Sequence, residues 1–226
     1  MSVRIHGRLI RAVIFDMDGL MLDSERLAQR AWQQASRDAG YDLSDDVFRV
    51  LVGRTIGDVR YELSGAFGEN YPLDDIYYQK QTLFEEYIIK DGLSIKAGLL
   101  ALVDKLDSLS IRKAIASSSS CDVIERNLRV VNIPLTRFDV LVGGDEVING
   151  KPAPDIYLKA AKYLNEEPEN CLVFEDSNAG VQAACAAGML TVMVPDLVSP
   201  DENSLSCAYK IVPSLDEFIS LLDDSH

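Results

Sequence analysis

Short apolar runs that alternate with amphipathic stretches constrain the fold of this chain more than any other feature of its sequence. Most runs are followed by a stretch with apolar residues at intervals of three and four, as on one face of a helix. This alternation is typical of a parallel α/β sheet. The predicted core strands are residues 12–15, 112–116, 140–142, 171–174 and 191–194. The predicted helices between them are residues 99–108, 121–130, 154–164 and 179–187.

Residues 25–93 follow a different pattern, because strand-like runs are missing and helical spacing prevails. Gly40 can end the first helix of this segment, and Ser44 can begin the next. The apolar stripe of that first helix consists of Leu27, Ala28, Ala31, Trp32 and Ala35. We therefore predict a helical insert after the first strand, with a return to the sheet near residues 94–100.

The composition narrows the possible functions. A formal net charge of -14 argues against nucleic-acid binding, which needs clustered Lys and Arg. No apolar run reaches the roughly 18 residues of a membrane span. The first residues, MSVRIHGRLI, lack the long apolar segment of a secretory signal. We therefore expect a cytoplasmic protein that has neither nucleic acid nor a membrane as a partner.

The rare reactive residues exclude further classes of site. The only histidines are His6 and His226, so Ser-His-Asp triads and histidine-rich metal sites are disfavoured. The cysteines lie far apart and form no CxxC pair, which suggests neither a zinc site nor a disulfide framework. The cysteines expected to be reduced thiols are Cys121, Cys171, Cys185 and Cys207. The chemistry should therefore depend mainly on carboxylates, hydroxyls and lysine.

Polar motifs follow the predicted strands. Asp16 and Asp18 come directly after the first of these strands. The other motifs are ASSSS at 116–120, GKPAPD at 150–155 and FEDSNAG at 174–180. Because ligands of parallel sheets bind beyond the carboxyl ends of the strands, we expect these motifs to converge on one crevice.

The residue types in these motifs suit phosphoryl transfer. The close anions, which need a shared hard cation, are Asp16, Asp18, Glu175 and Asp176. Ser117 and the amides after it offer hydrogen-bond donors to a phosphate if they open a helix, and Lys151 adds positive charge. Positioning and charge neutralisation carry most of the catalysis in such reactions. With no histidine available, an aspartate would act as the nucleophile and form an aspartyl-phosphate.

Four segments resemble, in order and spacing, the four motifs of the haloacid dehalogenase-like hydrolases. They are DMDGLMLDSE (16–25), IASSSS (115–120), GKPAPDIY (150–157) and FEDSNAGVQAACAAGM (174–189). In appearance the chain is most similar to the subfamily of β-phosphoglucomutases and small sugar-phosphate phosphatases. The resemblance implies an α/β fold with a Rossmann-like parallel sheet core and a helical cap domain inserted after the first strand. The implied division is core over residues 1–24 and 94–226, and cap over residues 25–93.

The same resemblance implies a role for each motif residue. Asp16 would be the nucleophile, and Asp18 would protonate the leaving oxygen and then activate the hydrolytic water. Ser117, Ser118 and Lys151 would bind the transferring phosphoryl group. The implied Mg²⁺ site consists of Asp16, Asp18 with its main-chain carbonyl, Glu175 and Asp176.

The predicted cap departs from the mutase pattern. Mutases of this subfamily carry a histidine where this chain has Ala28, an arginine near Ile56 and a lysine where this chain has Ser120. These departures favour plain hydrolysis. Glu25 and Arg54 are candidate substrate contacts, although an exposed surface role is about as plausible for each.

We therefore predict a monomeric, Mg²⁺-dependent phosphatase that acts on a small phosphorylated metabolite, such as a sugar or polyol phosphate. The alternative enzyme is a β-phosphoglucomutase-type phosphotransferase. A haloacid dehalogenase fits less well, because the metal-binding acids and Asp18 would then have no task. A protein of another class, which binds a phosphometabolite without catalysis, is disfavoured by the complete set of acids and lysine.

Overall fold

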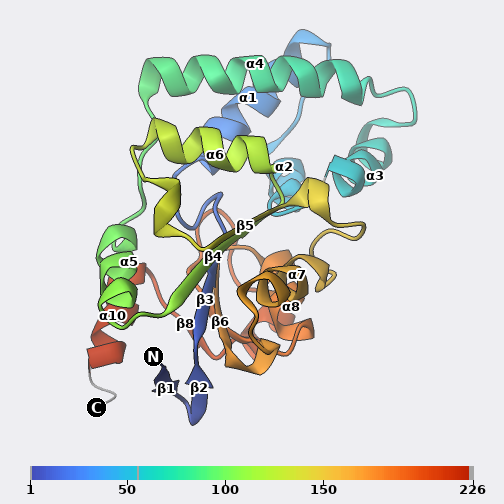
Figure 1. The fold of residues 1–226 in the computed structure, drawn as a ribbon. Helices are drawn as coiled ribbons and strands as arrows, with labels where there is room; N and C mark the ends of the chain where they lie inside the picture. Colours follow the sequence, from blue (N-terminus) through green and yellow to red (C-terminus); the bar gives the residue numbers. More distant parts are fainter. Residues whose placement is uncertain (1, 55, 224–226) are drawn as a thin grey trace.

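A computed structural model describes residues 2–54 and 56–223 and contains a six-stranded parallel sheet (Figure 1). The strand order is β5-β4-β3-β6-β7-β8, and every neighbouring pair is parallel. The strands are β3 Ala12–Phe15, β4 Arg112–Ser117, β5 Val140–Gly143, β6 Cys171–Glu175, β7 Leu190–Met193 and β8 Lys210–Ile211. The predicted strands and the α/β fold class are therefore confirmed, and β3 with its two acids lies between β4 and β6.

Helices cover both faces of this sheet because successive residues of a strand point to opposite sides. Val13 and Phe15 of β3 belong to one apolar cluster, which includes residues of α5, α6 and α10. Ala12 and Ile14 belong to the other, which includes residues of α7 and α8. The helices around the sheet are α5 Leu99–Ser108, α6 Cys121–Val130, α7 Asp155–Leu164, α8 Asn178–Ala186, α9 Glu202–Cys207 and α10 Leu215–Asp223. Across the described parts of the chain, none of the helices is long and apolar enough to cross a membrane.

An antiparallel hairpin precedes the sheet and was not predicted from the sequence. Its strands are β1 Val3–Ile5 and β2 Arg8–Ile10. His6 and Gly7 connect them with φ of 49° and 78°, as in the two-residue turns that match the twist of a hairpin. Three short 3₁₀ helices complete the core: η1 Leu135–Arg137, η2 Gly144–Glu146 and η3 Pro168–Asn170.

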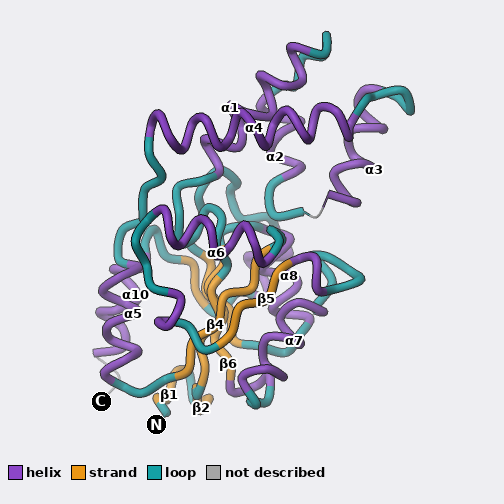
Figure 2. Tube along the Cα trace, turned by 45° about the horizontal axis from the view of Figure 1, so that its top comes forward, coloured by secondary structure: helices purple, strands orange, loops and turns teal. Residues whose placement is uncertain are grey.

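Four helices lie between β3 and α5 in the sequence, beyond the carboxyl ends of the strands (Figures 1 and 2). They are α1 Glu25–Asp38, α2 Asp45–Leu51, α3 Ile56–Phe67 and α4 Leu73–Asp91. Their apolar side chains form a separate cluster that includes Trp32, Phe48 and Leu63. This segment coincides with the predicted helical insert, whose treatment as a cap domain with the boundaries 25–93 stays a prediction.

The two connections to this helical segment run side by side. The Asp23 amide donates to the Ser94 carbonyl, and the Lys96 amide donates to the Met21 carbonyl, each at 2.9 Å. Asp196, from the loop after β7, accepts hydrogen bonds from Arg26 at 3.0 Å and Lys96 at 2.9 Å. One core carboxylate therefore holds both connections.

The expectation of four reduced cysteines was wrong for one pair. Cys185 of α8 and Cys207 at the end of α9 form a disulfide, with their Cα atoms 6.2 Å apart. The sequence could not show this pairing because it depends on the side-by-side packing of α8 and α9. Cys121 and Cys171 are free thiols, and the pKa of each is raised mainly by burial.

Replacing Phe174 with Ala should destabilise the protein by ~3–5 kcal/mol, the usual cost of removing a buried phenyl ring. Phe174 is fully buried, and its ring stacks on Phe15 with centroids 5.5 Å apart and meets the edge of Phe218 at 4.9 Å. Urea denaturation measures the change. The matched control is Tyr61→Ala, because Tyr61 is 80% exposed and its loss should change stability by less than ~0.5 kcal/mol. Equal effects of the two substitutions would contradict the described core.

Candidate active site

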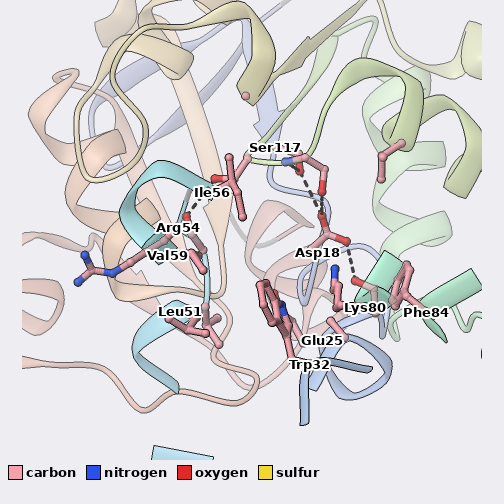
Figure 3. Close-up of a pocket in the computed structure, with 18 of the residues that line it drawn as sticks. Asp18, Glu25, Trp32, Leu51, Arg54, Ile56, Val59, Lys80, Phe84 and Ser117 are labelled. Atoms are coloured by element: carbon pink, nitrogen blue, oxygen red, sulfur yellow. Dashed lines mark hydrogen bonds between the residues drawn. The ribbon is translucent and has the colours of Figure 1, made fainter. Parts of the chain in front are cut away.

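A pocket of about 340 Å³ lies where the helical segment covers the carboxyl ends of the strands (Figure 3). Ligand sites in proteins usually range from about 300 to 1,000 Å³, so this pocket suits a small molecule. Asp16, Asp18 and Ser117 line it from the core. Trp32 and Lys80 line it from α1 and α4. Of the four motifs predicted to converge on one crevice, the first two line this pocket, whereas Lys151 of the third contacts Asp16 and itself contacts Glu175 of the fourth.

A buried lysine joins two of the predicted acids at the floor of this site. The Lys151 ammonium donates to Asp16 Oδ1 and to Glu175 Oε1, each at 2.5 Å. The Tyr157 hydroxyl donates to the same Glu175 oxygen at 2.7 Å. All four side chains are buried. Tyr157 was not singled out from the sequence, where it appears as one apolar position of a core helix.

The charges of this cluster depend on one another. Burial opposes the charged form of Lys151, but Asp16 and Glu175 outweigh it and raise the pKa of the ammonium well above its usual value. Burial also opposes ionisation of Glu175, yet the charge and hydrogen bond of Lys151 lower the pKa of that carboxyl. Burial raises the pKa of Asp16 well above its usual value, with Lys151 opposing the shift and Glu175 adding to it. The ammonium therefore compensates Glu175 more fully than Asp16.

Asp18 is held by three hydroxyl groups. Its Oδ1 accepts a hydrogen bond from Ser24 at 2.7 Å, and its Oδ2 accepts from Ser117 at 3.2 Å and from Ser119 at 2.9 Å. Figure 3 shows Asp18 and Ser117 pointing toward one another. Ser24 and Ser119 were not predicted, although both lie inside quoted motifs. Ser118 lines the pocket, but its hydroxyl donates to the Gly53 carbonyl of the helical segment at 3.0 Å.

The remaining predicted metal ligand, Asp176, is buried without a side-chain hydrogen bond from residues 2–54 or 56–223. Burial, with Glu175 and Asp16 adding to it, raises the pKa of Asp176 well above its usual value. A Cβ added at Gly19, where φ is +87°, would lie 2.2 Å from Asp176 Oδ2, so the main chain after Asp18 lies against this carboxylate. These oxygen donors and their uncompensated negative charge fit a hard cation such as Mg²⁺.

The carboxylate of Glu175 is fully engaged within the protein. Besides Lys151 and Tyr157, it accepts from the Asp176 amide, the Ser177 amide and the Ser177 hydroxyl, each at 3.0 Å. Across the described residues, no group of three or more Asp, Glu, His or Cys side chains is arranged to hold a metal ion. The metal site of Asp16, Asp18, Glu175 and Asp176 therefore stays a prediction, and Glu175 contacts Lys151 in the described structure.

The helical segment contributes two predicted ionisable groups and one unpredicted ionisable group to the pocket lining. Glu25 is buried in the pocket wall, and burial followed by the charge of Asp18 raises its pKa to about 8. Arg54 also lines the pocket, but it pairs with Glu62 at 3.0 Å and its guanidinium points away from Asp18 (Figure 3). Lys80 lies near Asp18 and Glu25 instead, and burial lowers its pKa. A lysine on an amphipathic helix is normally a surface residue, so no sequence signal identified it.

Comparisons with known proteins show the family to which this chain is similar. The family described as haloacid dehalogenase-like hydrolase matches residues 10–188. The phosphorylated carbohydrates phosphatase of Thermotoga maritima is 33% identical over 184 residues, which cover 80% of this chain and 82% of that protein. A crystal structure of CbbY from Rhodobacter sphaeroides in complex with phosphate superimposes with a TM-score of 0.81 and 27% identity, covering 95% of this chain and 99% of that one.

A further relative is much longer than this chain. Protein SUPPRESSOR OF QUENCHING 1, chloroplastic, from Arabidopsis thaliana, is 35% identical over 195 residues, or 84% of this chain. The matched region is only 18% of that plant protein.

Replacing Gly180 with Ala should destabilise the site by ~1–3 kcal/mol, the usual cost of overpacking. A Cβ at Gly180 would lie 1.7 Å from Glu175 Oε1, so the carboxylate would have to leave Lys151. The matched control is Gly65→Ala in α3, where a Cβ would meet nothing within 4 Å and better helix propensity should stabilise by up to ~1 kcal/mol. Urea denaturation compares the two variants. A neutral or stabilising Gly180→Ala would contradict the described packing of Glu175.

Replacing Glu25 with Gln should flatten the fall of stability with rising pH. The unfolded carboxyl titrates near 4.5 and the folded one near 8, so between these values the folded state keeps a proton that the unfolded state has lost. Stability should therefore fall as pH rises through this window, by up to ~1.4 kcal/mol per pH unit for one proton. Urea denaturation with Mg²⁺ from pH 5 to 8 measures the slope. Glu69→Gln, at an exposed site, is the control and should leave the slope unchanged.

Proposed function

We propose, since the chain belongs to the haloacid dehalogenase-like hydrolases, that it is a Mg²⁺-dependent phosphatase. Its substrate would be a small phosphomonoester such as a sugar or polyol phosphate. The observation that carries this proposal is the buried contact of Lys151 with Asp16. Two residues after Asp16, the carboxylate of Asp18 accepts hydrogen bonds from three hydroxyl groups. Similarity to a phosphorylated carbohydrates phosphatase supports the substrate class.

The first step transfers the phosphoryl group to Asp16. An oxygen of the Asp16 carboxylate attacks the phosphorus, and the bond from phosphorus to the leaving oxygen breaks. Asp18, protonated at this stage, gives its proton to that oxygen and releases the alcohol. Lys151 and Ser117 hold the oxygens of the phosphoryl group during the transfer. The products of this step are an aspartyl-phosphate and the free alcohol.

The second step regenerates the carboxylate. Asp18, now ionised, takes a proton from a water molecule, whose oxygen attacks the phosphorus and frees Asp16 with release of inorganic phosphate. Asp16, Asp176 and the main-chain carbonyl of Asp18 would hold Mg²⁺, which when bound neutralises the charge of the phosphoryl group. Glu175 would keep Lys151 within reach of Asp16 in both steps.

The pocket favours hydrolysis over the mutase alternative. The positions at which mutases of the subfamily carry a histidine, an arginine and a lysine are Ala28, Ile56 and Ser120, and all three line the pocket. None of these three side chains can form an ion pair with the second phosphate of a sugar bisphosphate, which a mutase must hold while the intermediate reorients. The predicted cytoplasmic location and monomeric state belong to the proposal as well.

Asp16→Asn should abolish turnover, because an amide cannot form the aspartyl-phosphate. Asp18→Asn should slow turnover by ~10²–10⁴-fold, the usual contribution of general acid-base catalysis. Phosphate release from hexose phosphates with Mg²⁺ measures both, and EDTA should stop the reaction of the unmodified protein. Asp75→Asn is the matched control, because Asp75 is exposed on α4 away from the pocket.

Two outcomes would overturn the proposal. If β-glucose 1-phosphate were converted to glucose 6-phosphate faster than phosphate is released, the chain would be a mutase. If the unmodified protein bound phosphorylated metabolites with Mg²⁺ but released no phosphate from any of them, it would be a binding protein.

A further inference from the structure

An asparagine that has no role in the proposed steps is buried beside the pocket. Asn127 of α6 is fully buried, and its Oδ1 accepts two 3.4 Å hydrogen bonds from the neighbouring Arg126. Its Nδ2 has no acceptor among residues 2–54 and 56–223, although nearly all buried polar atoms in proteins have a partner. A buried amide without an acceptor is costly, so this atom points to a group that the protein itself does not supply.

The position of Asn127 on α6 directs it toward the pocket. Ser120, Val123 and Asn127 all line the pocket, at the spacing of three and four that places residues on one face of a helix. Ser120 immediately precedes the helix, at the end of the serine run that faces Asp18. At 1.5 Å per residue, Asn127 lies about 10 Å farther along the helix axis than Ser120. Asn127 therefore adjoins the part of the pocket remote from the phosphate end.

A lysine of α4 is a second pocket donor, and it lies near Asp18 and Glu25 rather than at the remote end (Figure 3). An ion pair between Arg126 and Glu85 joins α6 to α4, on which Lys80 and Phe84 also line the pocket. Within residues 2–54 and 56–223, no carboxylate lies within ion-pair distance of the Lys80 ammonium. It lies over aromatic rings instead, 5.0 Å from the centroid of Phe84 and 5.8 Å from that of Trp32. The Asn127 amide is therefore the donor without an acceptor at the remote end.

We propose that Asn127 is a specificity-determining residue whose amide donates to an oxygen at the end of the leaving group remote from the phosphate. The substrate class is then phosphomonoesters of oxygen-rich alcohols, with a hydroxyl, carboxylate or second phosphate at the remote end. A leaving group without such an oxygen leaves the Asn127 amide unpaired in the complex, and sites built to hydrogen-bond a substrate discriminate strongly against such analogues. This inference rests on the proposed function.

The test compares alcohols of matched length. Hexyl phosphate carries no oxygen on its chain, whereas sorbitol 6-phosphate, 6-phosphogluconate and fructose 1,6-bisphosphate offer a hydroxyl, a carboxylate and a phosphate. We expect at least one of these three to exceed hexyl phosphate in kcat/KM by about 10-fold or more. Asn127→Asp keeps the side chain's shape and the acceptor for Arg126 but replaces the donor with an oxygen. The substitution should lower the ratio of kcat/KM for the preferred oxygenated substrate to kcat/KM for hexyl phosphate about 10-fold. The fall should come mainly from a higher KM for the oxygenated substrate. Asn203→Asp, the same change at an exposed site, should leave the ratio unchanged.

The outcomes separate this inference from the proposed function. No phosphate release from any of the four substrates by the unmodified protein would overturn both. Hydrolysis of hexyl phosphate as efficient as that of the other three would overturn the inference alone. An Asn127→Asp variant that loses activity equally on all substrates, or on none, would also overturn it. Asn127→Leu removes the amide altogether, and the same fall in the ratio for this variant excludes an effect of the new negative charge.

Discussion

The rest of the site depends on the buried contacts of the Lys151 ammonium with Asp16 and Glu175. Three buried ionisable groups can coexist only if their charges and hydrogen bonds compensate one another, since burying an unpaired charge is costly. Glu175 meets this condition with five hydrogen bonds, to which Tyr157 and the start of α8 contribute. The lysine can therefore remain charged at the carboxyl end of the sheet.

This arrangement explains the packing around the sheet as well as the chemistry. Gly180 leaves room for Glu175 where any side chain would collide with it, and Gly19 leaves room for Asp176. Burial raises the pKa of Asp16, which Lys151 compensates in part, and of Asp176, and these two acids are groups that a divalent cation would stabilise. The same few contacts therefore determine both the packing at this end of the sheet and the charges of the candidate catalytic groups.

The helices of residues 25–91 complete the site from the opposite side. Their connections run as a pair and share Asp196 of the core, while Ser118 and the Gly53 carbonyl join the two parts at the pocket. A cover of this kind can exclude water from the reacting groups and reopen for product release. In the proposed mechanism the core side of the pocket would carry the phosphoryl chemistry, and Asn127 of α6 would contact the leaving group.

The sequence by itself determined five strands of the sheet, four of the helices around it and the position of the candidate residues at strand ends, but not β8, α9 or α10. The strand at 12–15 and the helix at 121–130 follow from local periodicity, and Asp16, Ser117 and Lys151 lie in contiguous motifs at strand ends, so short-range patterns were sufficient. Only the tertiary structure decided which partners these residues have. The hydroxyls of Ser117 and Ser119 on Asp18, the disulfide of Cys185 with Cys207 and the exposure of Lys80 to the pocket each depend on segments that are separate in the chain. Such contacts leave no local signal, because the residue types involved are equally suited to a surface or a core. The unpartnered amide of Asn127 is the clearest case, because only the tertiary structure shows that this helical asparagine is buried, lines the pocket and lacks an acceptor among the described residues.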